Sequence, residues 1–146
     1  MSELLTLFTR ASKLLREAAD EAMSRHGVRV GQNIILEVLW REDGLTPGEI
    51  ARRLDLATPT VVNAATRMED AGLVLRERDS ADGRLVRLYL TPQARSVRGA
   101  IERERSALER RATSKLTSQE LRHLHTALAK IIDTLSQDRE PPSAGR

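Results

Sequence analysis

The amino-acid sequence predicts a mainly α-helical protein that contains one small β-hairpin. Helix-start signals recur along the 146 residues, residues 45–72 have the pattern of two short helices joined by a tight turn, and residues 73–90 have the pattern of a hairpin. Two helices joined in this way lay the second helix in a DNA groove, and a hairpin with arginine at its tip reaches the adjacent groove. The order of these parts therefore predicts a winged helix-turn-helix domain flanked by N- and C-terminal dimerisation helices.

Four helix starts follow from capping signals. Two segments, Thr46-Pro47-Gly48-Glu49 and Thr117-Ser118-Gln119-Glu120, have the pattern of a capping box. Two further pairs, Thr58-Pro59 and Thr91-Pro92, combine a capping hydroxyl with a following proline. These signals predict helix starts near residues 46, 58, 91 and 117.

The remaining helices follow from apolar spacing. We expect a first helix from about Ser2 to Arg25, ended by His26-Gly27, and a second from Gly31 to about Arg41. A long helix is expected from Pro92 to about Ser114, and a last one from Ser118 to about Ser136. The last helix has apolar residues spaced 3, 4, 3 and 4 apart, which is a heptad-like seam: Leu121, Leu124, Leu128, Ile131 and Leu135. The tail, residues 137–146, is expected to be disordered.

The helix after Thr58 has two different faces. Its apolar residues fall within one stripe and are expected to face the core: Val61, Ala64, Ala65 and Met68. The opposite face carries small hydroxyls, an amide and an arginine, which suit a major-groove surface: Thr60, Asn63, Thr66 and Arg67. Asp70 shares that face one turn later, so we expect only the N-terminal half to enter the groove. The alternative is an ordinary solvated face.

The hairpin is predicted from two strands, Leu73 to Arg78 and Leu85 to Leu90, with Asp82-Gly83 as the turn signal. Asp82 is two residues from Arg84 and is expected to hold that side chain in place before DNA arrives, which lowers the entropy lost on binding. The alternative is a hairpin that only covers the core.

Composition narrows the function classes. The net charge is only +3, and residues 44–90 contain seven arginines and seven acidic residues, so any DNA site must depend on the placement of charge. Arginine makes up 21 of the 24 basic residues, which favours phosphate and base contacts but also fits a GC-rich coding genome. The absence of cysteine excludes disulfides and thiol-based sensing. No apolar run is long enough for a membrane span, and the N-terminus lacks a signal-peptide pattern, so we expect a cytoplasmic location.

The outer helices predict a homodimer. The first helix is apolar on both sides and must therefore be buried on both sides, for which a second copy of the chain is the simplest partner. The alternative is a monomeric helical core. We expect a dimerisation helix at residues 1–30, a winged helix-turn-helix region at 31–91 and dimerisation helices at 92–136.

The motifs resemble those of the MarR family of winged helix-turn-helix transcriptional regulators, over nearly the whole chain. The most specific segment is Gly72 to Arg84, where the family pattern has arginine, two aspartates and the minor-groove arginine; the matching residues are Arg76, Asp79, Asp82 and Arg84. Leu45 to Ala51 resembles the first helix-turn-helix segment of the family, and Leu88 to Pro92 resembles its strand-to-helix junction. The chain departs from the family at Val62 and Asn63, which affects the operator sequence.

The resemblance implies a homodimeric regulator of transcription, usually a repressor, that binds a pseudo-palindromic double-stranded operator. Many members release DNA when a small, often aromatic, anion enters a cleft between the dimer helices and the winged domain. The expected cleft residues are Met23, His26, Arg29, Trp40 and Arg95, although Trp40 also fits the core. We expect no cofactor and no metal site, since His123 and His125 are two residues apart and diverge around a helix.

The DNA contacts expected from the helix face and the hairpin are Thr58, Thr60, Asn63, Thr66, Arg67, Arg76, Arg78, Asp82, Arg84 and Arg87. The rival function is a winged-helix protein–protein interaction module without specific DNA binding, which the neutral charge of residues 44–90 also fits. An enzyme is not expected, because the sequence has no glycine-rich phosphate loop, nucleophile elbow or paired metal ligands.

Overall fold

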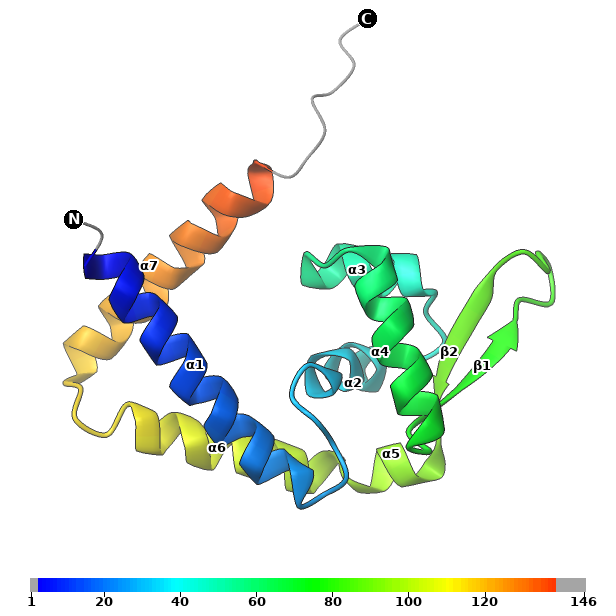
Figure 1. Cartoon of the computed structure of the whole chain (residues 1–146), viewed down its shortest axis with the longest axis horizontal. Coiled ribbons are helices and arrows are strands. Elements are labelled where there is room, and N and C mark those ends of the chain that lie inside the picture. Colours follow the sequence, from blue (N-terminus) through cyan, green and yellow to red (C-terminus); the bar gives the residue numbers. More distant parts are fainter. Residues whose placement is uncertain (1–2, 139–146) are drawn as a thin grey trace, which may run out of the picture. The chain divides into compact units, whose positions relative to one another are not determined.

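The computed structural model describes residues 3–138 and is mostly helical with one two-stranded antiparallel hairpin, as predicted (Figure 1). The elements in chain order are α1 (Glu3–Ser24), α2 (Gln32–Arg41), α3 (Pro47–Leu54), α4 (Thr58–Asp70), β1 (Val74–Arg78), β2 (Val86–Leu90), α5 (Pro92–Ser96), α6 (Arg98–Ala112) and α7 (Ser118–Gln137). The chain divides into two compact units between Leu108 and Glu109. No helix within residues 3–138 is long and apolar enough to cross a membrane.

Most predicted helix starts are confirmed by their capping bonds. Thr46 accepts a hydrogen bond from the backbone N–H of Glu49 (3.2 Å), and the Glu49 carboxylate accepts one from the backbone N–H of Thr46 (3.0 Å). The same reciprocal pair forms between Thr117 and Glu120, and Thr91 caps α5. The predicted cap at Thr58 is wrong: Ala57 is the N-cap without a side-chain bond, because Thr58 already belongs to the first helical turn.

The long helix predicted from residue 92 to about 114 is also wrong in one respect, because it is interrupted at Val97 between α5 and α6. Hydrogen bonds of helical spacing still run from Val97 N–H to Gln93 O (3.2 Å) and from Ile101 N–H to Val97 O (3.0 Å) across the interruption. Gly99 follows two residues later, and glycine weakens a helix interior.

The core of the first unit is built where α2, α3, α4 and the hairpin meet. Val61, Ala65 and Met68 of α4 are fully buried, which confirms the stripe predicted from their spacing. They join buried side chains of α2, α3 and both strands, such as Leu36, Ile50 and Leu88, in one cluster. The opposite face of α4 is therefore left outside the core.

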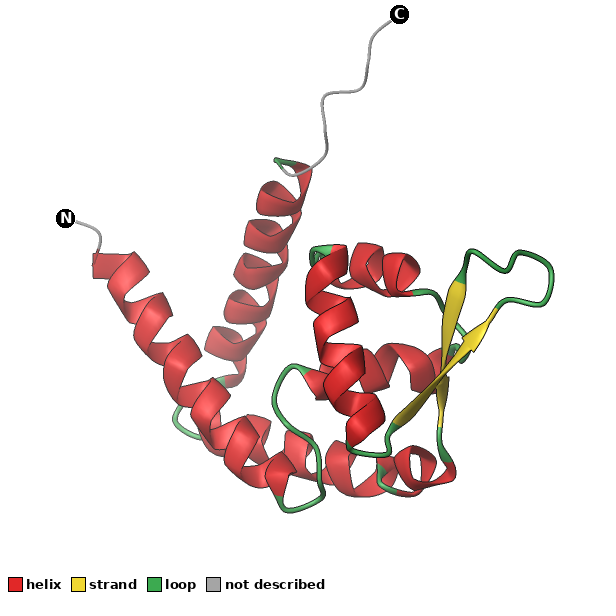
Figure 2. Cartoon of the chain, turned by 45° about the vertical axis from the view of Figure 1, so that its right-hand side comes forward, coloured by secondary structure: helices red, strands yellow, loops and turns green. Residues whose placement is uncertain are grey.

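The hairpin, which we call the wing, extends away from the helices (Figure 2). Its strands pair in the register Val74↔Leu90 to Arg78↔Val86, and residues 79–85 form the connecting loop. The base of the wing is fastened to the turn before α3, since Leu88 donates to Leu45 O (2.8 Å) and accepts from Gly44 N–H (3.0 Å). Gly44 has a φ of 76°, and a Cβ there would lie 2.8 Å from the ring of Tyr89, so only glycine fits this position.

The second unit contains α7, whose heptad-like seam lies on an exposed helix. Leu121, Leu124, Leu128 and Ile131 are 37–41% exposed, and Leu135 is 58% exposed. The tail predicted to be disordered lies outside the described residues, except for Gln137, which ends α7, and Asp138.

Candidate functional site

The exposed face of α4 carries the polar side chains expected to read DNA. Thr58, Thr60, Asn63 and Arg67 are all exposed, and so is Val62 on the flank. Pro59 at the second helical position has no backbone N–H, so the first turn of α4 has one backbone donor fewer. Side chains therefore supply most of the hydrogen-bonding groups there. This face is a regular row of hydrogen-bonding groups on a rigid helix.

Arg76 of β1 connects the wing to this helix. Its Nη2 donates to the backbone oxygen of Val62 (3.2 Å) and to the Thr66 hydroxyl, and that hydroxyl itself donates to Val62 O (3.1 Å). The backbone N–H of Arg76 also donates to the Glu69 carboxylate (3.3 Å). Arg76 and Thr66 are thus both engaged within the protein.

The loop at the tip of the wing presents Arg84. Its side chain is 91% exposed, and its guanidinium donates to the Asp82 carboxylate, with Nε at 3.1 Å and Nη2 at 3.4 Å from the two oxygens. This hydrogen bonding by Arg84, through the side chain first and the backbone second, lowers the pKa of Asp82. The Asp82–Arg84 pair expected from the sequence therefore forms.

The loop is longer than the Asp82-Gly83 signal indicates. Its turn spans 82–85, closed by a bond from Leu85 N–H to Asp82 O (3.0 Å). The Asp79 carboxylate shapes the other side by accepting from the backbone N–H groups of Ala81 (2.8 Å) and Asp82 (2.9 Å).

Arg87 has a different environment from Arg84. Its Nε donates to Asp79 (2.5 Å), its Nη1 donates to Gly44 O (2.8 Å), and Glu49 lies 4.0 Å away. Its side chain is only 29% exposed. The hydrogen bond from Arg87, with those from the backbone, lowers the pKa of Asp79 to about 2, and the same bond raises the pKa of Arg87.

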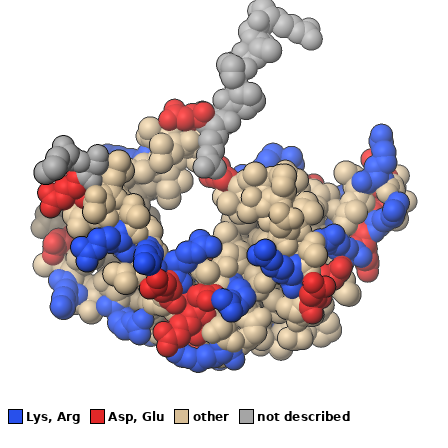
Figure 3. Space-filling model, in the orientation of Figure 1, with Lys and Arg blue, Asp and Glu red and all other residues tan. Residues whose placement is uncertain are grey.

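Arg78 lies between these two cases. It is exposed, and within residues 3–138 its one hydrogen bond is a long one from Nη1 to Gly83 O (3.4 Å). On the face shown in Figure 3, basic and acidic side chains are interspersed, and basic side chains lie at the end of the wing beside acidic ones. The placement of charge, rather than its total, distinguishes the wing tip.

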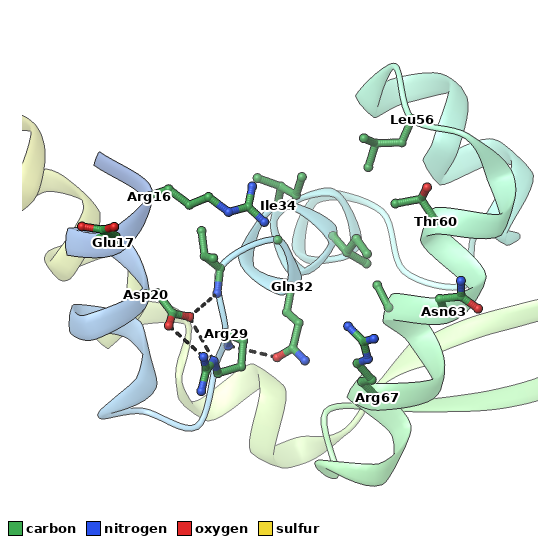
Figure 4. Close-up of a pocket in the computed structure, with 14 residues that line it drawn as sticks. Arg16, Glu17, Asp20, Arg29, Gln32, Ile34, Leu56, Thr60, Asn63 and Arg67 are labelled. Carbon is green, nitrogen blue, oxygen red and sulfur yellow. Dashed lines mark hydrogen bonds and ion pairs between the residues drawn. The ribbon is translucent and has the colours of Figure 1, made fainter. Parts of the chain in front are cut away.

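A pocket of about 860 Å³ opens beside the same face of α4 (Figure 4). Thr60, Asn63 and Arg67 line it from α4, and Arg16 lines it from α1. Glu17 and Asp20 of α1 also line it, together with Arg29 and Gln32, which are joined by a hydrogen bond from Arg29 N–H to the Gln32 side chain (3.0 Å). Arg29 is neutralised by a bidentate pair with Asp20 (3.0 and 2.9 Å), whereas Arg16 and Arg67 make no hydrogen bond or ion pair within residues 3–138.

The five residues expected to bind an effector are not brought together. Arg29 alone among them lines the pocket described above. Met23 is 2% exposed in the core, His26 lies 3.2 Å from Glu104, and the Trp40 indole donates to Ala94 O (3.1 Å). Arg95 pairs with Asp43 at 2.7 Å. These residues make structural contacts, and the reading of Trp40 as part of the protein interior fits its half-buried position against the core.

Sequence reasoning missed the pocket residues contributed by α1 and the anchoring role of Asp79. No spacing signal connects Arg16 with α4, because contact between such distant segments depends on the fold. Asp79 belongs to the wing motif in the sequence and follows the first predicted strand directly. In the structure its backbone N–H donates to Leu85 O across the loop (2.9 Å), which closes the hairpin.

Comparisons with known proteins agree with this geometry. Residues 26–85 match the model of the MarR family. The regulator MgrA of Staphylococcus aureus is 24% identical over 135 residues, covering 92% of this chain and 90% of that protein. TtmR of Methylorubrum extorquens, also a transcriptional regulator, is 33% identical over 101 residues, covering 69% of this chain and 52% of that protein.

A solved structure has the same fold. Reduced AbfR bound to DNA superposes with a TM-score of 0.77 at 24% identity, covering 94% of this chain and 93% of that one. With the helix order, the wing and the matching family model, these similarities lead to one conclusion: the chain belongs to the MarR family of winged helix-turn-helix transcriptional regulators, which are not enzymes.

Proposed function

We propose that this chain is a homodimeric regulator that binds a specific double-stranded DNA operator and acts as a repressor. The observation that carries the proposal is the exposed polar face of α4 beside a wing that ends in the exposed Arg84. A structural relative, AbfR, was solved bound to DNA, which supports the same use of the fold here.

In the proposed complex the N-terminal half of α4 enters the major groove. Asn63 pairs with adenine and Val62 touches a thymine methyl. Arg84 enters the minor groove, and Arg78 contacts a nearby phosphate. The carboxylate of Asp70 is repelled by the DNA phosphates and keeps the C-terminal end of α4 away from the DNA backbone.

The proposed dimer rests on exposed apolar surface. In α1, Leu4, Leu5 and Leu14 are 61–65% exposed, and α7 exposes its seam as well. Exposed apolar surface of this kind, on each helix taken by itself, marks an interface. Residues 1–30 and 92–136 would then be the dimerisation segments around the DNA-binding region 31–91, and two-fold symmetry would set the two copies of α4 about 34 Å apart, one helical turn of DNA.

The proposed effector is a small anion that binds the pocket beside α4. Arg16 and Arg67 supply two cationic groups that form no ion pair within residues 3–138, and Ile34 and Leu56 supply apolar lining suited to an aromatic body. Since Asn63 and Arg67 line this pocket and also face DNA in the proposed complex, a ligand there favours the DNA-free state by differential binding.

Selection from a random duplex pool, followed by affinity measurements across a salt series, tests the DNA proposal. We expect a two-fold consensus and an affinity that falls steeply with salt, because phosphate contacts release counterions. The absence of duplex binding at low salt would instead support a protein–protein interaction module. Sedimentation of the free protein tests the dimer independently.

Replacing Asn63 with alanine tests the assignment of base contacts. The Asn63→Ala variant should lose preference at one base pair of each half-site, worth about 1–3 kcal/mol, because one bidentate contact is removed. The measurement is a gel-shift titration on the selected duplex and on duplexes changed at single positions. Equal loss on every duplex would contradict the role of Asn63 as a base reader.

A further inference from the structure

The geometry points to Arg76 as a residue that positions the recognition helix α4 for specific DNA binding, and not as a phosphate ligand. This inference rests on the proposed function and revises one of its expected contacts. Arg76 is exposed and lies in the wing, so its charge alone suggests a contact with DNA. Its hydrogen bonds indicate another use.

The Arg76 guanidinium is directed at the backbone of α4. Nη2 donates to Val62 O (3.2 Å) and to the Thr66 hydroxyl, which closes a triangle because that hydroxyl also donates to Val62 O (3.1 Å). Val62 and Thr66 flank Asn63 on the turn that carries the base-reading face. A rotation or shift of this turn would therefore break these bonds.

A second bond ties the same residue to the other end of α4. The backbone N–H of Arg76 donates to the Glu69 carboxylate (3.3 Å). Arg76 thus fixes β1 against α4 at two points about two helical turns apart. The wing and the recognition helix are held in one register, which lets Arg84 and Asn63 meet adjacent grooves together.

This arrangement also changes what Thr66 offers to DNA. A threonine hydroxyl has one donor and two acceptor sites. The donor is used by Val62 O and one acceptor by Arg76, so the side chain has no hydrogen-bond donor left and keeps one acceptor site and its methyl group. Thr66 would then contribute apolar contact, such as contact with a thymine methyl, in place of a donated hydrogen bond.

Arg78 provides a matched control. It lies two residues along the same strand and carries the same charge, but it makes only the 3.4 Å bond to Gly83 O. A phosphate contact and a positioning contact differ in salt dependence. Loss of a phosphate contact lowers the slope of log affinity against log salt by about one and weakens binding to all sequences alike, whereas loss of a positioning contact does neither.

The experiment compares the full-length wild type, Arg76→Ala, Arg76→Gln and Arg78→Ala on two duplexes, the one selected from the random pool and one of scrambled sequence. For Arg76→Ala we expect about tenfold weaker binding to the selected duplex, unchanged binding to the scrambled one and an unchanged salt slope, from the loss of charged hydrogen bonds partly screened by solvent. Arg76→Gln, which keeps one NH2 group as a donor, should lie between it and the wild type. Arg78→Ala should lose about one unit of slope and weaken both duplexes equally.

A salt slope lowered by about one in Arg76→Ala, or an unchanged ratio of the two affinities, would overturn the inference. Amide hydrogen exchange in the absence of DNA gives a second measurement. Exchange in residues 62–69 should become several-fold faster in Arg76→Ala but not in Arg78→Ala, and equal exchange in the two variants would also overturn it. If the wild type fails to bind any duplex, the proposed function fails, while the exchange result still decides whether Arg76 holds α4.

Discussion

The base and the tip of the wing use arginine in opposite ways. At the base, formed by the paired strands β1 and β2, Arg87 is 29% exposed and donates hydrogen bonds to Asp79 and Gly44 O. At the tip, formed by the loop 79–85, Arg84 is 91% exposed, and within the described part of the chain its side chain bonds to Asp82 alone. The two arginines are three positions apart in the sequence, and their hydrogen-bond partners decide which guanidinium is available to a ligand.

The difference shows that a basic residue near a proposed DNA surface is not by itself a DNA contact. Arg87 was expected to bind phosphate, and that stays a prediction; its hydrogen bonds to Asp79 and Gly44 O connect the wing to the turn before α3. The Arg84 side chain is exposed to solvent, and its bonds to Asp82 order it without burying it. The base supplies rigidity, and the tip supplies the group that reaches outward.

The largest expected effect is on the free energy of unfolding, and it compares a buried with an exposed leucine in the strands at the base of the wing. Leu88 is fully buried and bonds to Leu45, whereas Leu75 on the neighbouring strand is 51% exposed. Leu88→Ala should lower the free energy of unfolding by about 2–5 kcal/mol, because it leaves a cavity in the core. Leu75→Ala should change it by less than about 0.5 kcal/mol. Urea denaturation measures both, and similar losses would show that the base is not a continuation of the core.

At the tip, the expected effect is on binding and not on stability. Arg84→Ala should weaken binding to the selected duplex about thirtyfold, or about 2 kcal/mol, from the loss of charged hydrogen bonds in the minor groove. The loss should be similar on duplexes that differ only in major-groove contacts, because minor-groove readout is degenerate. Fluorescence anisotropy measures it, and the melting temperature serves as the control. A fall in melting temperature without weaker binding would reverse the assignments of tip and base.

The sequence predicted the parts of this molecule that depend on local chemistry. The capping boxes at Thr46 and Thr117, the buried stripe of α4 and the pairing of Asp82 with Arg84 all arise between residues no more than a few positions apart. The cap at Thr58 failed because the hydroxyl and proline signal fits either of two adjacent positions at a helix start.

The parts that were not predicted depend on contacts between distant segments. Arg87 bonds to an oxygen 43 residues away, and Arg76 bonds to one 14 residues away across a helix end and a turn. Arginine spacing contains no information on such partners, since the charge pattern is the same whether the guanidinium points to protein or to solvent. The pocket beside α4 was missed for the same reason, because Arg16 meets that face only in the folded chain.

The next comparison replaces Arg87, which connects the base of the wing to the turn before α3. Arg87→Ala should lower the melting temperature more than Arg84→Ala does, because it removes the partner of Asp79 and leaves Gly44 O with one donor fewer. The pKa of Asp79 should also rise from about 2 toward 3.8, since the side-chain bond from Arg87 is the largest cause of its depression. NMR titration of the carboxyl carbon reports this shift, and Arg84→Ala should leave it in place. An unshifted pKa in Arg87→Ala would mean that the backbone N–H groups alone hold the carboxylate.

The smallest expected effect is on the pH dependence of stability, and it comes from Asp79, where the tip of the wing joins the base. The folded protein holds Asp79 ionised with a pKa of about 2, below its ordinary value of 3.8. Its contribution to stability is therefore fully present above about pH 4 and is lost as the pH falls toward 2. Asp79→Asn removes this contribution, so the difference in unfolding free energy between the wild type and the variant should be larger at pH 5 than at pH 3. Comparing the wild type with the variant at each pH cancels the effects of the other acidic groups. If the difference in unfolding free energy were the same at both pH values, the Asp79–Arg87 pair would add no stability. The pair would then serve only to shape the loop that presents Arg84.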